Sequence, residues 1–197
     1  MTGEGGKASW RARLRTARRS LGPADLAAAA DALREHLLDR LAGAARVAAY
    51  VPVGREPGSL ELLDAMRDSG TEILLPVVVP GGLDWVAYRG RLELVVGALG
   101  TREPTGPRLG AASLTTVDTV LVPALAVDRL GTRLGRGAGY YDRALALVDR
   151  GTAVAALLHD GELVGHLPRD PWDRPVTAAC TPALGWTELP VVEHHDG

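Results

Sequence analysis

A short segment rich in glycine and arginine combines residue types that suit a polyanionic ligand. It runs Arg133-Leu134-Gly135-Arg136-Gly137-Ala138-Gly139-Tyr140-Tyr141-Asp142. Because glycine adopts backbone angles that other residues avoid, successive N–H groups can turn inward and form a concave anion site. Arg133 and Arg136 add permanent charges that match phosphate oxygens. The spacing predicts a phosphate-binding loop, with a glycine-rich surface turn before a helix as the alternative.

The carboxylate of Asp142 gives this loop one candidate ligand for a divalent cation, which could bind between it and a phosphate. A helical pattern begins at Tyr140, and the first turn of a helix adds free N–H groups and the positive end of a dipole. The segment is not a Walker A loop, because no Gly-Lys-Ser/Thr follows, and its GxGxG spacing differs from the dinucleotide-binding fingerprint. The residues alone therefore indicate a phosphate loop beside a candidate Mg²⁺ ligand.

The length and charge of the chain limit the classes of protein to consider. Its 197 residues suit one domain, 1–197, in which we expect 1–6 and 191–197 to be flexible. A net charge of −2 argues against nucleic acid or an anionic membrane as partner. No apolar run approaches the roughly 18 residues of a membrane span, and no apolar core of a signal peptide is present. The single cysteine, Cys180, favours a reducing compartment, so we expect a cytoplasmic monomer with Cys180 buried.

Hydrophobic periodicity predicts an alternation of strands and helices. Ser59 is expected to cap the third helix, and Pro76 to interrupt the second strand. The expected helices are 7–21, 23–41, 60–67 and 140–148, and the expected strands are 46–51, 72–79, 83–88, 118–122 and 153–158. The order predicts a single three-layer α/β domain whose largely parallel central sheet is flanked by helices, with 118–122 as a central strand.

Basic residues line one side of the first expected helix, next to an apolar stripe of Trp10, Leu14, Ala17 and Leu21. A solvated basic face is the common explanation for such a stripe. A nucleic-acid-binding arm is another, but no aromatic or basic stretch elsewhere supports it. A third is neutralisation of a polyphosphate bound at the glycine loop. The basic residues are Lys7, Arg11, Arg15 and Arg18.

A turn-rich loop, 52–58, follows the first expected strand and contains Val53 and Glu56. Ligands of open α/β sheets bind at the carboxyl ends of strands, so this loop is a candidate for substrate contact. Ordinary loop charge is the alternative for Glu56. Trp85 and Tyr88 could cover a flat ring, although core packing is favoured.

The glycine loop also carries a family resemblance. The run Val122-Pro123-Ala124-Leu125-Ala126-Val127-Asp128, then Gly131, then Arg133 to Arg143, resembles the signature of the 5-formyltetrahydrofolate cyclo-ligases, also called methenyltetrahydrofolate synthetases. The turn Gly100-x-x-Glu103-Pro104 resembles another element of that family, with no chemical role that the residues define. The resemblance implies a phosphosugar isomerase/CoA-transferase-like fold and an enzyme that uses ATP and Mg²⁺.

The resemblance also implies roles for individual residues. ATP contacts are expected at Lys7, Arg11, Arg133, Leu134, Gly135, Arg136, Gly137, Ala138, Gly139, Tyr140 and Tyr141. Substrate contacts are expected at Val53, Glu56, Arg136, Gly137, Ala138, Gly139 and Tyr140, and catalysis at Arg136 and Tyr140. Metal ligands are expected at Asp142 and Asp173, with Asp170 as the alternative to Asp173.

The implied reaction closes 5-formyltetrahydrofolate into 5,10-methenyltetrahydrofolate, with transfer of the ATP γ-phosphoryl group to the formyl oxygen. No residue stands out as a covalent nucleophile, which agrees with such a route. Two alternatives remain at this point: a phosphosugar isomerase or CoA-transferase relative that needs no nucleotide, and a non-catalytic protein of the same fold that binds folate or nucleotide.

Overall fold

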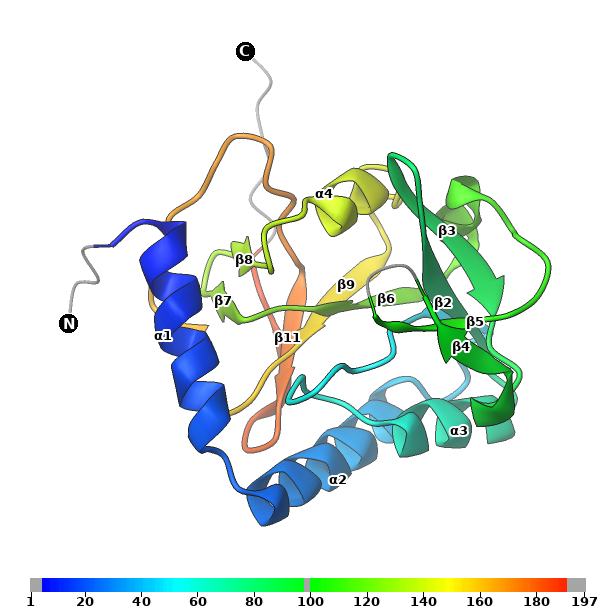
Figure 1. Ribbon diagram of the computed structural model, residues 1–197, viewed down its shortest axis with the longest axis horizontal. Coiled ribbons are helices and arrows are strands. Elements are labelled where there is room, and N and C mark those ends of the chain that lie inside the picture. The colour runs from blue at the N-terminus through cyan, green and yellow to red at the C-terminus, as the bar shows by residue number, and fades with distance from the viewer. Residues whose placement is uncertain (1–4, 98–99, 191–197) are drawn as a thin grey trace.

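Strands and helices alternate along the chain in the computed structural model, which describes residues 5–97 and 100–190 (Figure 1). Residues 1–4 and 191–197, which fall within the segments expected to be flexible, lie outside these ranges. Within them, none of the helices is both long and apolar enough to cross a lipid bilayer.

The central sheet is made of β1 (Arg46–Ala48), β2 (Glu72–Val79), β3 (Gly82–Ala87), β6 (Thr119–Pro123), β9 (Ala153–Leu157), β11 (Ala178–Thr181) and β12 (Gly185–Glu188). Its spatial order is β12-β11-β9-β6-β1-β2-β3. The inner pairs are parallel: β1 with β2 and β6, and β9 with β6 and β11. Only the edges, β2–β3 and β11–β12, are antiparallel. The predicted α/β class with a largely parallel sheet is confirmed, and β6 lies at its centre.

Helices cover both faces of this sheet (Figure 1). On one face, α2 (Pro23–Arg40) and α3 (Leu60–Asp68) bury Leu37 and Leu62 in a core cluster with β1 and β2. On the other, α4 (Tyr140–Leu145) and the 3₁₀ helix η2 (Ala111–Thr116) bury Leu145 and Leu114. The predicted cap of α3 is present, since the Ser59 hydroxyl accepts the N–H of Leu62 at 3.1 Å. The molecule thus has the three layers expected.

β2 continues through Pro76, contrary to the expected interruption. Pro76 pairs with Trp85 of β3, while β1 pairs with β2 only from Glu72 to Leu74. In an antiparallel ladder, alternate residues point their N–H groups away from the partner strand. The position of Pro76 therefore faces the side of β2 that β1 does not reach, where a missing donor costs no ladder bond.

A second, smaller sheet includes two strands between the expected strand 118–122 and the expected helix 140–148, where the sequence analysis predicted no strand. It consists of β7 (Ala126–Asp128) between β8 (Arg133–Leu134) and β10 (Leu163–Val164). The helix α1 (Lys7–Ser20) packs against it, with Trp10 and Leu14 buried against Leu125 and Leu134. This packing fixes α1 beside the glycine loop.

A two-stranded hairpin, β4 (Leu94–Val96) with β5 (Arg102–Pro104), follows β3 and the short 3₁₀ helix η1 (Arg91–Glu93). Trp85 and Tyr88 are 1% and 4% exposed and belong to the core, which confirms the favoured prediction of core packing over a ligand platform. Cys180 is fully buried, as predicted.

Two elements are shorter than the sequence predicts. β1 ends at Ala48 instead of residue 51, and α4 ends at Leu145 instead of residue 148. Apolar residues continue beyond both ends, and Tyr50 and Val51 stay buried in an irregular path. Buried residues keep the sequence apolar after the regular hydrogen bonding has ended. Hydrophobic periodicity alone therefore cannot locate the end of the strand or helix.

Candidate active site

A cleft of about 1240 Å³ opens between α1, α4 and the β2–β3 side of the central sheet. Tyr50 and Pro123, at the carboxyl ends of the parallel strands β1 and β6, line it, which is where open α/β sheets bind ligands. It also contains every candidate site residue that the sequence analysis singled out: Lys7, Arg11, Val53, Glu56, all residues from Arg133 to Asp142, Asp170 and Asp173. Tertiary structure therefore brings these four segments of the sequence to one cavity.

The glycine loop leaves β8 and turns into α4. Gly137 and Gly139 have φ angles of +109° and +69°, which favour glycine. Arg136 and its neighbours Gly137 and Ala138 are exposed, while Leu134 is buried in the hairpin. α4 has only six residues, so its dipole contributes less than a full helix would. The exposed loop and the surrounding cations are the groups of the cleft that are chemically suited to an anion.

Arg11 links α1 to the glycine loop. Its Nε donates to the carbonyl oxygen of Gly135 at 2.9 Å. A Cβ at Gly137 would lie 3.4 Å from the Arg11 guanidinium carbon, so the guanidinium lies directly against the loop. The contact places a positive charge beside the exposed amides.

Lys7 lies between two carboxylates. Its Nζ donates to Asp170 Oδ2 at 2.6 Å and to Asp173 Oδ2 at 2.5 Å. Burial alone would lower the pKa of Lys7, but these hydrogen bonds and charges outweigh it and hold the pKa above its ordinary 10.5. Asp173 Oδ2 also accepts the backbone N–H of Asp170 at 2.8 Å. Lys7, a candidate phosphate ligand, is thus paired with Asp173, a candidate metal ligand.

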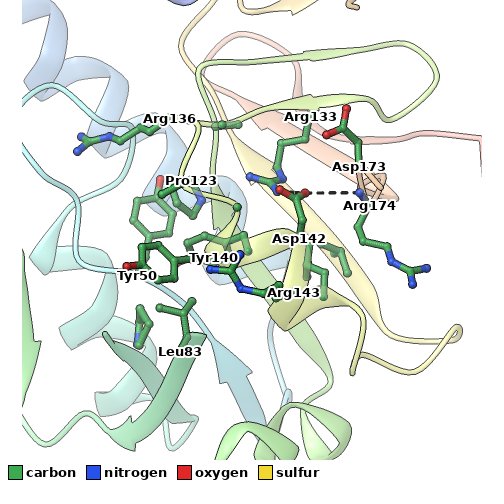
Figure 2. Close-up of a pocket in the computed structure, with 18 of the residues that line it drawn as sticks. Tyr50, Leu83, Pro123, Arg133, Arg136, Tyr140, Asp142, Arg143, Asp173 and Arg174 are labelled. Atoms are coloured by element: carbon green, nitrogen blue, oxygen red, sulfur yellow. Dashed lines mark hydrogen bonds and ion pairs between the residues drawn. The ribbon is translucent and has the colours of Figure 1, made fainter. Parts of the chain in front are cut away.

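Arg133 is a buried partner of Asp142. Its side chain is 4% exposed and its Nη2 lies 2.7 Å from Asp142 Oδ1. The same oxygen accepts the backbone N–H of Arg174 at 3.5 Å, drawn as a dashed line in Figure 2. Among described residues, Arg133 Nε is buried without a hydrogen-bond partner. Of the two loop arginines expected to bind phosphate, Arg136 is exposed, whereas Arg133 lines the cleft but is largely buried and paired with Asp142.

Arg136 reaches across the cleft to Glu56. The Arg136 Nη2 and Glu56 Oε1 atoms lie 2.8 Å apart, and the two side chains are 54% and 9% exposed. The other Glu56 oxygen accepts the backbone N–H of Val53 at 2.9 Å. Both oxygens of Glu56 therefore have partners, one with the exposed Arg136 side chain and one with the backbone of its own loop.

Aromatic side chains form the apolar part of the cleft. Figure 2 shows Tyr50 and Tyr140 in the cleft with Leu83 of β3, and Tyr140 packs against the core cluster that contains Leu83. Burial, and then the nearby Glu56 charge, raise the pKa values of Tyr50 and Tyr141 well above the ordinary 10.0. Both hydroxyls therefore stay protonated at neutral pH. The Arg143 guanidinium carbon lies 5.2 Å from the centre of the Tyr140 ring.

The donor set suits Mg²⁺ held jointly with a ligand. Asp142 and Asp173 both line the cleft, and Asp142 Oδ2 and Asp173 Oδ1 accept no hydrogen bond from any described residue. Over the described ranges, no group of three or more His, Cys, Asp or Glu residues could hold a metal by itself. Mg²⁺ usually takes one or two carboxylates, with water and phosphate oxygens completing its shell. Two carboxylates beside an anion-binding loop fit that pattern.

The basic stripe on α1 is not a solvated face along its whole length. Of its four basic residues, Arg15 is exposed, Lys7 and Arg11 are half-buried and Arg18 is buried. Arg18 is buried and donates to Glu162 Oε1 at 2.7 Å and to the carbonyl of Ala124 at 2.6 Å, whereas Ala17, expected in the apolar stripe, is exposed.

Sequence reasoning missed several residues that support the site. Asp128 is fully buried and accepts the N–H groups of Leu130, Thr132 and Leu167, so it ties β7 to the loop before Asp170. Asp128 could have been identified from the sequence, because it ends the run from Val122 to Asp128 that resembles the family signature. No sequence pattern indicated a role for Glu162, because its partner Arg18 lies 144 residues away in sequence.

Comparisons with known proteins agree with this geometry. Residues 4–182 match the model of the 5-formyltetrahydrofolate cyclo-ligase family. The chain is 43% identical over 189 residues to the 5-formyltetrahydrofolate cyclo-ligase of Mycolicibacterium smegmatis, which covers 91% of this chain and 97% of that protein. It is 33% identical over 144 residues to the enzyme of that name from Escherichia coli K12, which covers 71% and 79%.

Solved structures give the same result. The NMR structure of the Aquifex aeolicus 5,10-methenyltetrahydrofolate synthetase superposes with a TM-score of 0.75 at 29% identity, over 96% of this chain and 97% of that one. A 5,10-methenyltetrahydrofolate synthetase from Mycoplasma pneumoniae has a TM-score of 0.69 at 17% identity, over 88% and 96%, and shares the fold.

Proposed function

This chain belongs to the 5-formyltetrahydrofolate cyclo-ligase family, and we propose that it uses ATP and Mg²⁺ to convert 5-formyltetrahydrofolate into 5,10-methenyltetrahydrofolate, ADP and phosphate. One observation carries the proposal beyond family membership. A single cleft combines the exposed glycine loop, three cations from two elements and two carboxylates suited to Mg²⁺, and these are the groups that a polyphosphate substrate needs. The cations are Lys7, Arg11 and Arg136.

The reaction has to turn a poor leaving group into a good one. A formamide oxygen does not leave readily, so the γ-phosphoryl group is transferred to the N5-formyl oxygen: an O–P bond forms there and the β–γ bridging O–P bond breaks to give ADP. N10 then attacks the formyl carbon, its proton passes to solvent, and the C–O bond breaks to release phosphate. Neither step needs a covalent bond to the enzyme, so catalysis depends on positioning and charge stabilisation.

The nucleotide binds at the glycine loop in this proposal. The amides from Gly135 to Gly139, with Lys7 and Arg11, hold the phosphates, and Leu134 and Tyr141 shape the base of the loop. Arg136 is the catalytic cation, because its long exposed side chain can reach the transferred phosphoryl group and stabilise the negative charge that develops on it. Arg133 acts through Asp142.

Asp142 and Asp173 would hold Mg²⁺, with Asp170 orienting Lys7 instead of binding the metal. When bound, the ion would neutralise phosphate oxygens and make ADP a better leaving group. For Asp173 to serve as a ligand, Lys7 has to exchange its carboxylate partner for a phosphate, which the opposite charges favour.

5-Formyltetrahydrofolate binds beside the nucleotide, between the loop that carries Val53 and Glu56 and the side chain of Tyr140. Glu56 has a buried carboxylate that can accept ring N–H groups once Arg136 has moved to phosphate. Tyr140 lies between the two ligands and orients the formyl group against the γ-phosphate. We further propose that the chain, as one domain over 1–197, acts as a cytoplasmic monomer.

The test mixes the protein with ATP, Mg²⁺ and 5-formyltetrahydrofolate and follows methenyltetrahydrofolate by its absorbance and ADP by a coupled assay. Equal amounts of both products are expected, and omission of either ATP or Mg²⁺ should abolish them. Folate binding without ADP release would favour a non-catalytic protein, and turnover without nucleotide would favour an isomerase or transferase.

A further inference from the structure

Glu103 is a buried carboxylate on the wall of the same cleft, away from the glycine loop. It lies in the middle of β5 and is 7% exposed. Pro76 and Val78 of β2 and Leu83 of β3 line the cleft with it. The carboxylate is packed so closely against Gly97 that any Cβ at that position would overlap it. Glu103 is therefore held in place on an apolar wall.

The protein uses only one oxygen of this carboxylate. Glu103 Oε1 accepts the backbone N–H of Val78 at 3.3 Å and the hydroxyl of Thr101 at 3.4 Å. Val78 lies on the part of β2 that β1 does not reach, so Glu103 satisfies an N–H group that has no neighbouring strand. A neutral amide oxygen would satisfy it equally well, so this contact does not account for the negative charge.

No described residue neutralises that charge. Glu103 forms no ion pair across 5–97 and 100–190, and its Oε2 accepts no hydrogen bond there. The neighbouring Arg102 is directed elsewhere, to the carbonyl of Arg91 at 3.3 Å. Burying a carboxylate without a partner is costly, so such a group usually has a ligand or a donor to bind. The cleft is the side from which a donor can approach.

We propose that Glu103 binds the 2-amino and N3–H edge of the pteridine ring of 5-formyltetrahydrofolate, which makes it a second carboxylate for the folate beside Glu56. The inference rests on the proposed function. The pyrimidinone half of this reduced pteridine is flat, with apolar faces and adjacent N–H donors on one edge, and a carboxylate accepts two such donors in parallel. The apolar side chains of Val78 and Leu83 provide a surface for the ring face, and Glu103 provides the acceptor at its edge.

The test measures the Kd of 5-formyltetrahydrofolate by calorimetry for the wild type and Glu103→Gln. Glutamine keeps an oxygen for the Val78 N–H but removes an unpaired buried charge, so Tm should not fall, while Kd rises about tenfold or more. Affinity for a non-hydrolysable ATP analogue should not change. Glu93→Gln, on the same hairpin unit but exposed and outside the cleft, is the matched control and should bind as the wild type does.

A second ligand separates direct contact from an indirect effect. A 5-formyltetrahydrofolate analogue in which hydrogen replaces the 2-amino group should bind the wild type about tenfold more weakly, yet bind Glu103→Gln with little further loss. Equal losses in both proteins, or an unchanged Kd for Glu103→Gln, would overturn the proposal. Folate binding without turnover in the wild type would contradict the proposed reaction instead, so the two failures are distinguishable.

Discussion

Carboxylates on the two sides of the cleft are balanced in different ways. Beside the glycine loop each one has a cation: Asp173 has Lys7, Asp142 has Arg133 and Glu56 has Arg136, at 2.5 to 2.8 Å. On the β2–β5 side, the described residues give Glu103 two long neutral hydrogen bonds and no ion pair. The difference is large in electrostatic terms, because an unpaired buried charge is far more costly than a paired one.

The comparison suggests two ways of preparing a site for its ligands. Beside the glycine loop, ion pairs hold the cations and carboxylates in position before any ligand binds. A bound polyphosphate would take over as the anionic partner of Lys7 and Arg136, and a bound Mg²⁺ would take over as the cationic partner of Asp173. On the folate side, the ligand itself would supply the missing donor. Substitutions on the two sides should therefore affect different kinetic parameters.

The largest effect is expected for Asp142→Asn. It removes a proposed metal ligand and leaves the buried Arg133 without its ion-pair partner, so turnover should fall roughly 100-fold. The Mg²⁺ concentration for half-maximal rate should rise as well. The rate is measured across a Mg²⁺ titration, with Asp39→Asn on the exposed side of α2 as control. An unchanged titration would remove Asp142 from the metal site.

Lys7→Met should weaken nucleotide binding. The variant keeps the length of the side chain but loses a charge next to the phosphates, which corresponds to about 2 kcal/mol, or a KM for ATP about 30-fold higher. The KM for folate should stay constant. Arg15→Met, on the exposed face of the same helix, is the matched control. A rise in the folate KM of equal size would show that α1 had moved as a whole.

Glu56→Gln tests the ion pair across the cleft and predicts an improvement. Without the Glu56 charge, Arg136 no longer has to leave a partner before it binds phosphate, so the KM for ATP should fall about threefold, the size expected of a partly exposed pair. Its folate Kd should rise less than that of Glu103→Gln, since Arg136 already neutralises Glu56. The reverse order would contradict the comparison of the two sides.

The smallest effect concerns alkaline stability. Because the pKa of Lys7 is raised above 10.5 in the folded protein, its ion pairs stabilise the fold fully below that pH and are lost as pH rises through the folded pKa. The Tm difference between the wild type and Lys7→Met should therefore stay constant up to the ordinary pKa of 10.5 and narrow only as the pH rises above it. A difference that stays constant above that pH as well would mean that the Lys7 charge does not contribute to stability.

The sequence by itself determined the class of fold and most of the cleft. Alternating apolar runs predicted the parallel sheet, and the glycine–arginine spacing around Arg136 identified the loop that lines the cavity. These features are local, since a strand, a cap such as Ser59 or a glycine turn depends on residues a few positions apart.

Only the tertiary structure decided which charges meet. Lys7 with Asp173, Arg18 with Glu162, and Val78 with Glu103 join segments that are 166, 144 and 25 residues apart, and no spacing rule in the sequence connects them. The pairing depends on how the helix α1 docks on the small sheet and where β1 stops beside β2. Local sequence patterns therefore identify which residues can bind or react, whereas burial and charge balance in the folded cleft decide which of them pair with each other.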